Sequence, residues 1–298
     1  MILALHLASL AVLPPLMIGV IQRIKARVAG RRGPPLLQLV WDLSRLMRKD
    51  IVRSRTTSWV FLAGPVVGLV ATLGAALVVP FGLPSAPVEF AGDLVLFAYL
   101  LALGRFLTVL AALDTGSAFE GMGAAREATF ACLTEPALFL GLLAGVRVAG
   151  GTSMAGVLGR AGVWEPGGAP MLLVVLALFL VLLVENCRIP FDDPTTHLEL
   201  TMIHEAMVLD HSGPPLALIL YGAAVKLFVY AAVLVRLVVP FTGSWVRDEA
   251  SFVAGILGVA IVVGLVESTT ARVQLPRVPR LLVSATLLSA FGLLLVAR

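Results

Sequence analysis

Titratable side chains gather in one segment of this otherwise apolar sequence, from Glu185 to Gly213, between two long apolar runs. The segment holds three of the four histidines and a third of the eighteen carboxylates in the chain. Its titratable residues are Glu185, Asp192, Asp193, His197, Glu199, His204, Glu205, Asp210 and His211. An apolar protein that concentrates such groups in one place is typically handling charge there.

The histidines of this segment recur every seven residues, at His197, His204 and His211. Asp193-Pro194 has the form of a helix N-cap followed by proline at the first helical position, so we expect a short helix over about 195–209. The spacing is too wide for one helix to hold a metal ion, and His204-Glu205 lacks the second histidine of a zincin motif. We therefore favour a polar face that touches a soluble partner, with titration near neutrality, over a metal site.

Other charged residues lie inside the apolar runs. Glu135 comes about seven residues into its run, roughly 10 Å from one membrane surface at 1.5 Å per residue, and Lys226 lies near the middle of another. Arg105 is a second cation within a run. Glu135, beside Pro136, is either a protonated or helix-capping side chain or a proton-relay or gating site; Lys226 is either half of a structural ion pair or a titrating group.

Glu185 and Glu267 lie at the ends of their runs, on the same expected side of the membrane. Together with Glu127 and Glu135 they predict an acidic entry, linked by water to Lys226 deeper in the bundle. The alternative for Glu185 and Glu267 is an ordinary interfacial charge.

The composition indicates a membrane protein. Hydrophobic residues make up 59% of the chain, charged residues only 13%, and the mean hydropathy is +1.00, whereas soluble proteins carry roughly 25% charged residues. The net charge of +4 is accounted for by basic residues that set membrane topology. We therefore expect no nucleic-acid partner. Two cysteines, Cys132 and Cys187, are too few for an iron–sulfur cluster and lack zinc spacing, so we expect no cofactor or metal bound by this chain.

Apolar runs of about 20 residues predict membrane-spanning helices, and the sequence contains eight. They cover approximately 2–22, 58–80, 92–113, 128–148, 170–188, 214–239, 250–267 and 280–297. The predicted fold class is all-α: a polytopic membrane protein with about eight transmembrane helices, forming a single integral membrane domain over 1–298.

Basic residues set the expected orientation. Residues 23–57 contain ten Lys and Arg, and 114–127, 186–213 and 268–280 add five on the same side, against five on the other. The positive-inside rule then places both termini outside and these segments in the cytoplasm.

The first of these segments, 23–57, contains a predicted amphipathic helix. Pro34-Pro35 can open a helix, and apolar residues recur with helical spacing over 34–52. The helix is expected to lie either at the membrane interface or against a partner.

Several blocks together resemble one family, the membrane subunit of energy-converting, group 4 nickel–iron (NiFe) hydrogenases, including formate hydrogenlyase. That subunit is similar to the complex I membrane subunit beside the quinone chamber. The blocks are 30–38 with Arg31, Arg32, Gly33, Pro34 and also Asp42; 114–127; Thr134-Glu135-Pro136; 185–213; and 267–272 followed by 277–279. The sequences Arg32-Gly-Pro-Pro-Leu36 and Asp193-Pro-Thr-Thr-His-Leu-Glu-Leu200 look like the hydrogenase branch.

The resemblance implies a subunit of a prokaryotic inner (cytoplasmic) membrane complex. Its implied partners are a hydrogenase-like large subunit with a NiFe centre, a small subunit with Fe-S clusters, antiporter-like membrane subunits and the lipid bilayer. It also implies that Glu135 and Glu185 belong to a charge-transfer path.

We therefore predict two groups of functional residues. The charge-transfer and coupling group is Glu135, Glu185, Lys226, Glu127, Glu267 and Arg105. The partner-docking group in the coupling loop 186–213 is Arg188, Asp192, Asp193, His197, Glu199, His204, Glu205 and Asp210. Two alternatives remain open: a quinone-chamber subunit of a complex I-like dehydrogenase, and a stand-alone secondary transporter, although no inverted repeat is evident.

Overall fold

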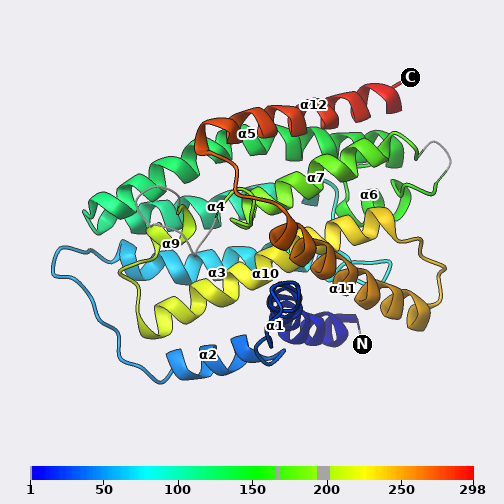
Figure 1. Cartoon of the computed structure of the whole chain (residues 1–298). Coiled ribbons are helices and arrows are strands. Elements are labelled where there is room, and N and C mark those ends of the chain that lie inside the picture. The colour runs from blue at the N-terminus through cyan, green and yellow to red at the C-terminus, as the bar shows by residue number, and fades with distance from the viewer. Residues whose placement is uncertain (1, 166–167, 193–201) are drawn as a thin grey trace.

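The computed structural model describes residues 2–165, 168–192 and 202–298, and within these ranges the regular elements are helices without any strand (Figure 1). The elements are α1 (Ile2–Val28), α2 (Gln38–Leu46), α3 (Val60–Val78), α4 (Asp93–Asp114), α5 (Ala118–Ala149), α6 (Met154–Arg160), α7 (Met171–Glu185), α9 (His204–Met207), α10 (Gly213–Val238), α11 (Trp245–Thr269), the 3-10 turn η1 (Leu275–Arg277) and α12 (Val278–Val296). The all-α class predicted from the sequence is confirmed.

Seven helices in the described ranges are long and apolar enough to cross a membrane: α1, α3, α4, α5, α10, α11 and α12. Each overlaps one of the predicted runs, and the prediction of a polytopic membrane protein is confirmed. The remaining run, predicted at 170–188, corresponds to α7, which has only 15 residues. At 1.5 Å per residue α7 is about 22 Å long, shorter than the roughly 30 Å hydrocarbon core.

Two helices extend well beyond the apolar runs that predicted them. α1 continues to Val28, so its last turn carries Lys25 and Arg27. α5 has 32 residues and begins at Ala118, ten residues before the predicted run. Glu127 therefore lies on a helix. It shares one face of that helix with residues deeper in the bundle.

The predicted amphipathic helix is present but shorter than 34–52. It is α2, which begins after Pro34-Pro35 rather than at it and packs against α1 and α10. Leu39 is half-buried, whereas Trp41 is 64% exposed. The helix therefore keeps one apolar face for the bundle and leaves apolar groups on the other.

α10 lies at the centre of the helical bundle (yellow in Figure 1). It packs against α1, α2, α3, α6, α7 and α11, and almost every side chain from Ala224 to Leu237 is buried. On one side lie α5, α7 and α12, and on the other α1 and α11 (Figure 1). A helix that is apolar all round is buried all round, which places the one lysine of α10, Lys226, inside the bundle.

The helix predicted over about 195–209 differs from the structure in its described part. Residues 193–201, with Asp193, His197 and Glu199, lie outside the described residues. Met202 and Ile203 are not helical, and only the four residues of α9 follow. α9 packs against the start of α5, where a Cβ on Gly123 would come within 2.9 Å of the Ile203 carbonyl oxygen. The absence of a side chain at Gly123 permits this close contact.

Candidate functional site: a charge cluster beside a cavity

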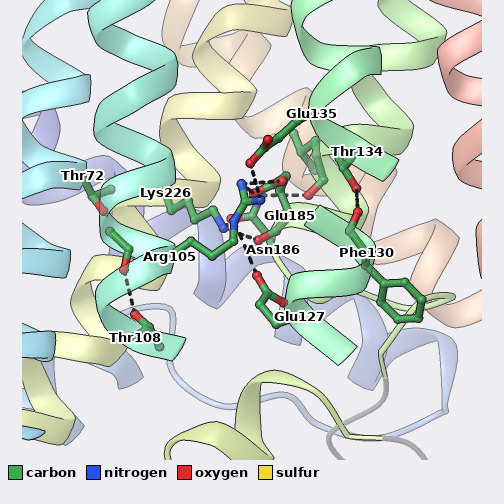
Figure 2. Close-up of polar contacts among 12 residues, drawn as sticks. Thr72, Arg105, Thr108, Glu127, Phe130, Thr134, Glu135, Glu185, Asn186 and Lys226 are labelled. Carbon is green, nitrogen blue, oxygen red and sulfur yellow. Dashed lines mark hydrogen bonds and ion pairs between the residues drawn. The ribbon is translucent and has the colours of Figure 1, made fainter. Parts of the chain in front are cut away.

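Five charged side chains from four helices meet inside the bundle (Figure 2). They are Arg105 of α4, Glu127 and Glu135 of α5, Glu185 of α7 and Lys226 of α10. We call this set the charge cluster. All five were among the charge-transfer residues predicted from the sequence.

Arg105 is the hub of the charge cluster. Its Nη2 donates to both carboxylate oxygens of Glu185, at 2.9 and 3.0 Å, and its Nη1 donates to Glu135 at 3.1 Å. Its Nε lies 3.7 Å from the Glu127 carboxylate. A guanidinium presents several donors in a fixed fork, so one arginine can engage three carboxylates at once.

Lys226 engages Glu185 from the opposite side. Its Nζ lies 3.0 Å from the Glu185 Oε2 atom and donates to the Glu185 backbone carbonyl at 2.6 Å. That carbonyl is at the last residue of α7, where helices leave carbonyls without a partner and favour a cation. The end of α7 therefore explains why Lys226 is held here, and Lys226 does form an ion pair.

The three carboxylates of the charge cluster differ in exposure. The Glu185 side chain is 3% exposed and the Glu127 side chain 13%, whereas that of Glu135 is 43% exposed. Arg105, 9% exposed, connects them. The charge cluster thus leads from the nearly enclosed Glu185 to the half-exposed Glu135, and with three carboxylates and two cations it carries a formal charge of −1 when all five groups are ionised.

A cavity of about 320 Å³ adjoins the charge cluster. Arg105, Glu127, Glu185 and Lys226 form part of its wall. Apolar side chains of α1, α2, α3 and α10 line another part, and the residues that follow α7, together with α9, line a third. Water or a ligand in this cavity would therefore contact the charge cluster directly.

The described part of segment 186–213 folds over this cavity. The Asp192 carboxylate, in a residue only 2% exposed, accepts hydrogen bonds from the backbone N–H groups of Ile203 and His204 at 3.1 and 3.2 Å. It thus caps the start of α9. Arg188, His204 and Glu205 also line the cavity.

The two histidines in the described part of this segment are neutral at pH 7. Burial, with help from the nearby Lys226 and Arg188 cations, lowers the pKa of His204 to about 4. Burial alone lowers the pKa of His211 to about 4, and the His211 ring stacks on Phe61 with centroids 3.9 Å apart. The expected titration near neutrality and shared helix face are therefore not found for this pair.

Glu267, predicted to join the acidic entry, makes a separate set of contacts. Its carboxylate lies 2.7 Å from the Lys25 Nζ atom and 3.4 Å from a guanidinium nitrogen of Arg188. In the first-loop motif, the Asp42 carboxylate accepts a hydrogen bond from Gln38 at 3.0 Å. The remaining motif residues lie in the connection between α1 and α2: Arg31, Arg32, Gly33 and Pro34.

The sequence analysis missed Glu120. It is fully buried, and its carboxylate accepts a hydrogen bond from the backbone N–H of Asp210 at 3.2 Å. Glu120 therefore fastens the end of the 186–213 segment to the first turn of α5. Its position in the first turn of a helix was the available signal, but the predicted start of that helix at 128 concealed it.

Among the described residues, no group of three or more His, Cys, Asp and Glu side chains could hold a metal ion. The charge cluster itself can bind and transfer protons, or bind a cation, through carboxylates whose charge two neighbouring cations balance.

Comparisons with known proteins agree with these features. The chain is 31% identical over 282 residues to formate hydrogenlyase subunit 4 of Escherichia coli K12, covering 90% of this chain and 89% of that protein. It is 30% identical over 233 residues to an NADH-quinone oxidoreductase subunit of Rubrobacter xylanophilus, covering 75% of this chain and 69% of that protein.

The fold also matches a solved structure. A chain of the membrane-bound sulfane sulfur reductase, an archaeal respiratory membrane complex, superimposes with a TM-score of 0.83 at 19% identity, covering 99% of this chain and 97% of that one. The family model described as NADH dehydrogenase matches residues 1–298. The chain therefore belongs to the NADH dehydrogenase family of membrane subunits.

Proposed function

We propose that this chain is the membrane-anchoring and ion-translocation-coupling subunit of a multisubunit hydrogenase, a formate hydrogenlyase or a related complex. The likeness to formate hydrogenlyase subunit 4 supports the class of complex. The observation that carries the coupling role is the charge cluster, which joins a cavity beside the described part of segment 186–213 to the half-exposed Glu135.

In this proposal the soluble arm docks on segments 23–57 and 186–213, which face the cytoplasm of a prokaryotic cell, with both termini on the other side of the inner membrane. The arm consists of a large subunit with a NiFe centre and a small subunit with Fe-S clusters. Electrons pass through these partners, and the docking residues of 186–213 transmit the resulting change to Glu185.

The charge cluster transmits that change because its charges are close together. Two unit charges 4 Å apart interact by about 4 kcal/mol at an effective dielectric constant of 20. Any movement of Glu185 relative to Arg105, now 2.9 Å away, therefore alters the electrostatic support that Arg105 gives to Glu135. Proton occupancy at Glu135 follows from the state of Glu185.

Glu135 is the proposed exit of this path. Its side chain is 43% exposed on a helix long and apolar enough to span a membrane, and a carboxylate left exposed at membrane depth is costly. We propose that an antiporter-like membrane subunit covers it and takes up the displaced proton or sodium ion.

The test replaces Glu135 or Glu185 with glutamine in the whole complex, reconstituted into vesicles. Each variant should retain hydrogen turnover while the number of ions moved per turnover falls by about tenfold or more, since glutamine can neither bind nor release a proton. Glu165→Gln, a change at an exposed carboxylate outside the charge cluster, is the matched control. Unchanged ion movement in both Glu135→Gln and Glu185→Gln contradicts the proposal.

The cavity favours a second candidate, a quinone-chamber subunit of a complex I-like dehydrogenase. Its volume of about 320 Å³ and its mixture of apolar and charged walls fit the general features of a small-molecule site. Purification in mild detergent distinguishes the candidates: companion hydrogenase subunits support the first, and a companion arm with quinone-dependent activity supports the second. A chain that purifies alone and transports ions would be a secondary transporter.

A further inference from the structure

We infer that Glu267 is a positioning residue: it holds the Arg188 guanidinium away from Glu185 and so keeps the charge cluster at two cations. This inference rests on the coupling function proposed for the charge cluster. It gives Glu267 a role different from the charge-transfer role that its position in the sequence suggested.

Glu267 is strongly held by two cations. Its side chain, at the end of α11, is only 2% exposed, and its two carboxylate oxygens engage different partners: Oε2 lies 2.7 Å from Lys25 of α1, and Oε1 lies 3.4 Å from Arg188. A carboxylate between two cations attracts both, and burial strengthens that attraction by lowering the local dielectric constant. Glu267 thus ties the segment that follows α7 to α1 and α11.

Arg188 stands between the two sets of charges. It comes three residues after Glu185 and lines the same cavity as Glu185 and Lys226. Its backbone is fixed, because its N–H donates to the Leu183 carbonyl at 2.8 Å and its carbonyl accepts from Phe191 at 2.8 Å. Loss of Glu267 therefore frees the side chain of Arg188 but not its backbone.

A freed Arg188 side chain would find the carboxylates of the cavity. Glu185 already binds Arg105 and Lys226, and a third cation would hold it permanently ionised and release Arg105 toward Glu135. The carboxylates of the charge cluster could then no longer alternate between their protonated and ionised forms. Glu267 prevents this by giving Arg188 a carboxylate of its own.

The Glu267→Gln variant is expected to fold. Glutamine matches glutamate in size, and a separate backbone hydrogen bond, from Val273 N–H to the Pro190 carbonyl at 3.0 Å, still joins the segments after α11 and α7. Glu267→Asp retains the charge and is the conservative control.

The experiment compares Glu267→Gln, Glu267→Asp, Arg188→Gln and the double variant Glu267→Gln/Arg188→Gln in the reconstituted complex, with turnover and ions moved per turnover measured together. Glu267→Gln should lower the ratio of ions to turnover by about threefold or more, since it adds one unpaired cation near Glu185. With Arg188 already replaced, the loss of Glu267 should have no further effect, so the double variant should match Arg188→Gln, which also accounts for any loss of docking. A merely structural brace predicts a further loss, so a double variant with a lower ratio than Arg188→Gln overturns the inference, as does an unchanged ratio in Glu267→Gln.

A second measurement is independent of ion movement. Phenylglyoxal modifies accessible guanidinium groups, and mass spectrometry of the intact complex reports the rate at Arg188. The rate should rise several-fold in Glu267→Gln and remain near wild type in Glu267→Asp, with Arg247, exposed and outside both docking segments, as the internal reference. If the wild-type complex moves no ions, the proposed function fails; an unchanged modification rate in Glu267→Gln overturns the inference whatever the outcome for the function.

Discussion

Two buried arginines, in different halves of the bundle, have different kinds of partner. Arg105 lies beside the cavity and shares its donors among three carboxylates. Arg236, near the other end of α10, is 4% exposed and lies over the Phe241 ring at 3.9 Å, while its Nη1 donates to the Phe81 carbonyl at 3.5 Å.

The surroundings of Arg236 are aromatic. The Phe81 ring stacks on His6 at 3.8 Å and on Phe252 at 5.6 Å, and it meets Phe228 edge-on. Ring faces and a backbone carbonyl do not titrate. The nearby buried Asp248 carboxylate, whose charge also acts on Arg236, accepts hydrogen bonds from Thr242 and Gly243 and forms no direct ion pair with Arg236. The partners of Arg105 can each gain or lose a proton, and the difference between the two arginines is one between a fixed and an adjustable environment.

The largest expected effect comes from Arg105→Met. Removing this cation leaves Glu127, Glu135 and Glu185 with Lys226 alone, and loss of one partner from a buried ion pair costs about 3–5 kcal/mol. Thermal unfolding of the purified protein in detergent, followed by intrinsic fluorescence, measures the loss. Arg105→Lys, which keeps the charge but not the fork, should lose less. A methionine variant as stable as wild type would show that the charge cluster is not held by Arg105.

A smaller effect is expected from acidification, through His211. Its pKa is lowered to about 4 by burial, compared with about 6.5 when unfolded. Between these values the unfolded chain binds more protons, so stability falls as the pH decreases through this window, by about 2 kcal/mol between pH 7 and pH 5. The sign follows from a neutral histidine in the folded state.

His211→Phe is the control for this pH dependence. Phenylalanine can keep the stack on Phe61 but cannot be protonated, so unfolding measured from pH 7 to pH 5 should show a shallower decline. An identical slope in wild type and His211→Phe would mean that burial of this ring does not contribute. The difference between the two slopes measures how strongly burial alone, without an ion pair, disfavours protonation of His211.

The smallest effect is expected from Arg236→Met. A desolvated cation–π contact contributes about 2 kcal/mol, but methionine retains much of the apolar contact with the neighbouring rings and removes the cost of burying a cation. Unfolding should therefore be only slightly easier, and ions moved per turnover should be unchanged. A loss of coupling as large as that of Glu135→Gln would remove the distinction between the two arginines.

Much of the fold could be predicted because hydrocarbon thickness sets the length of an apolar run. That rule locates helices but not their ends, since a helix can continue into water. α5 begins at Ala118 rather than 128, because the membrane surface alone does not terminate a helix. The start of α9 depends on Asp192, eleven residues before Ile203. A single sequence does not show which distant side chain caps such a short helix.

The members of the charge cluster could be proposed because charges within apolar runs are rare. Their arrangement could not, because Arg105 and Glu185 are 80 residues apart in sequence and any of several cations might have paired with any carboxylate. Glu267 is an example. It is a glutamate expected at the same depth as Glu185, yet it pairs with Lys25 and Arg188. Helix packing decides between such alternatives, and a single sequence does not specify that packing.

The shortness of α7 has a consequence for the membrane itself. Nine of its 15 residues are buried, Glu185 among them, so neighbouring helices and not lipid surround much of it. Its deficit of about 8 Å relative to the hydrocarbon core must be made up by non-helical chain, which is tolerated at membrane depth only inside protein or beside water. Residues 186–188 meet that condition at the cavity wall. Water in the cavity would therefore reach the buried Glu185 carboxylate at the depth where α7 ends.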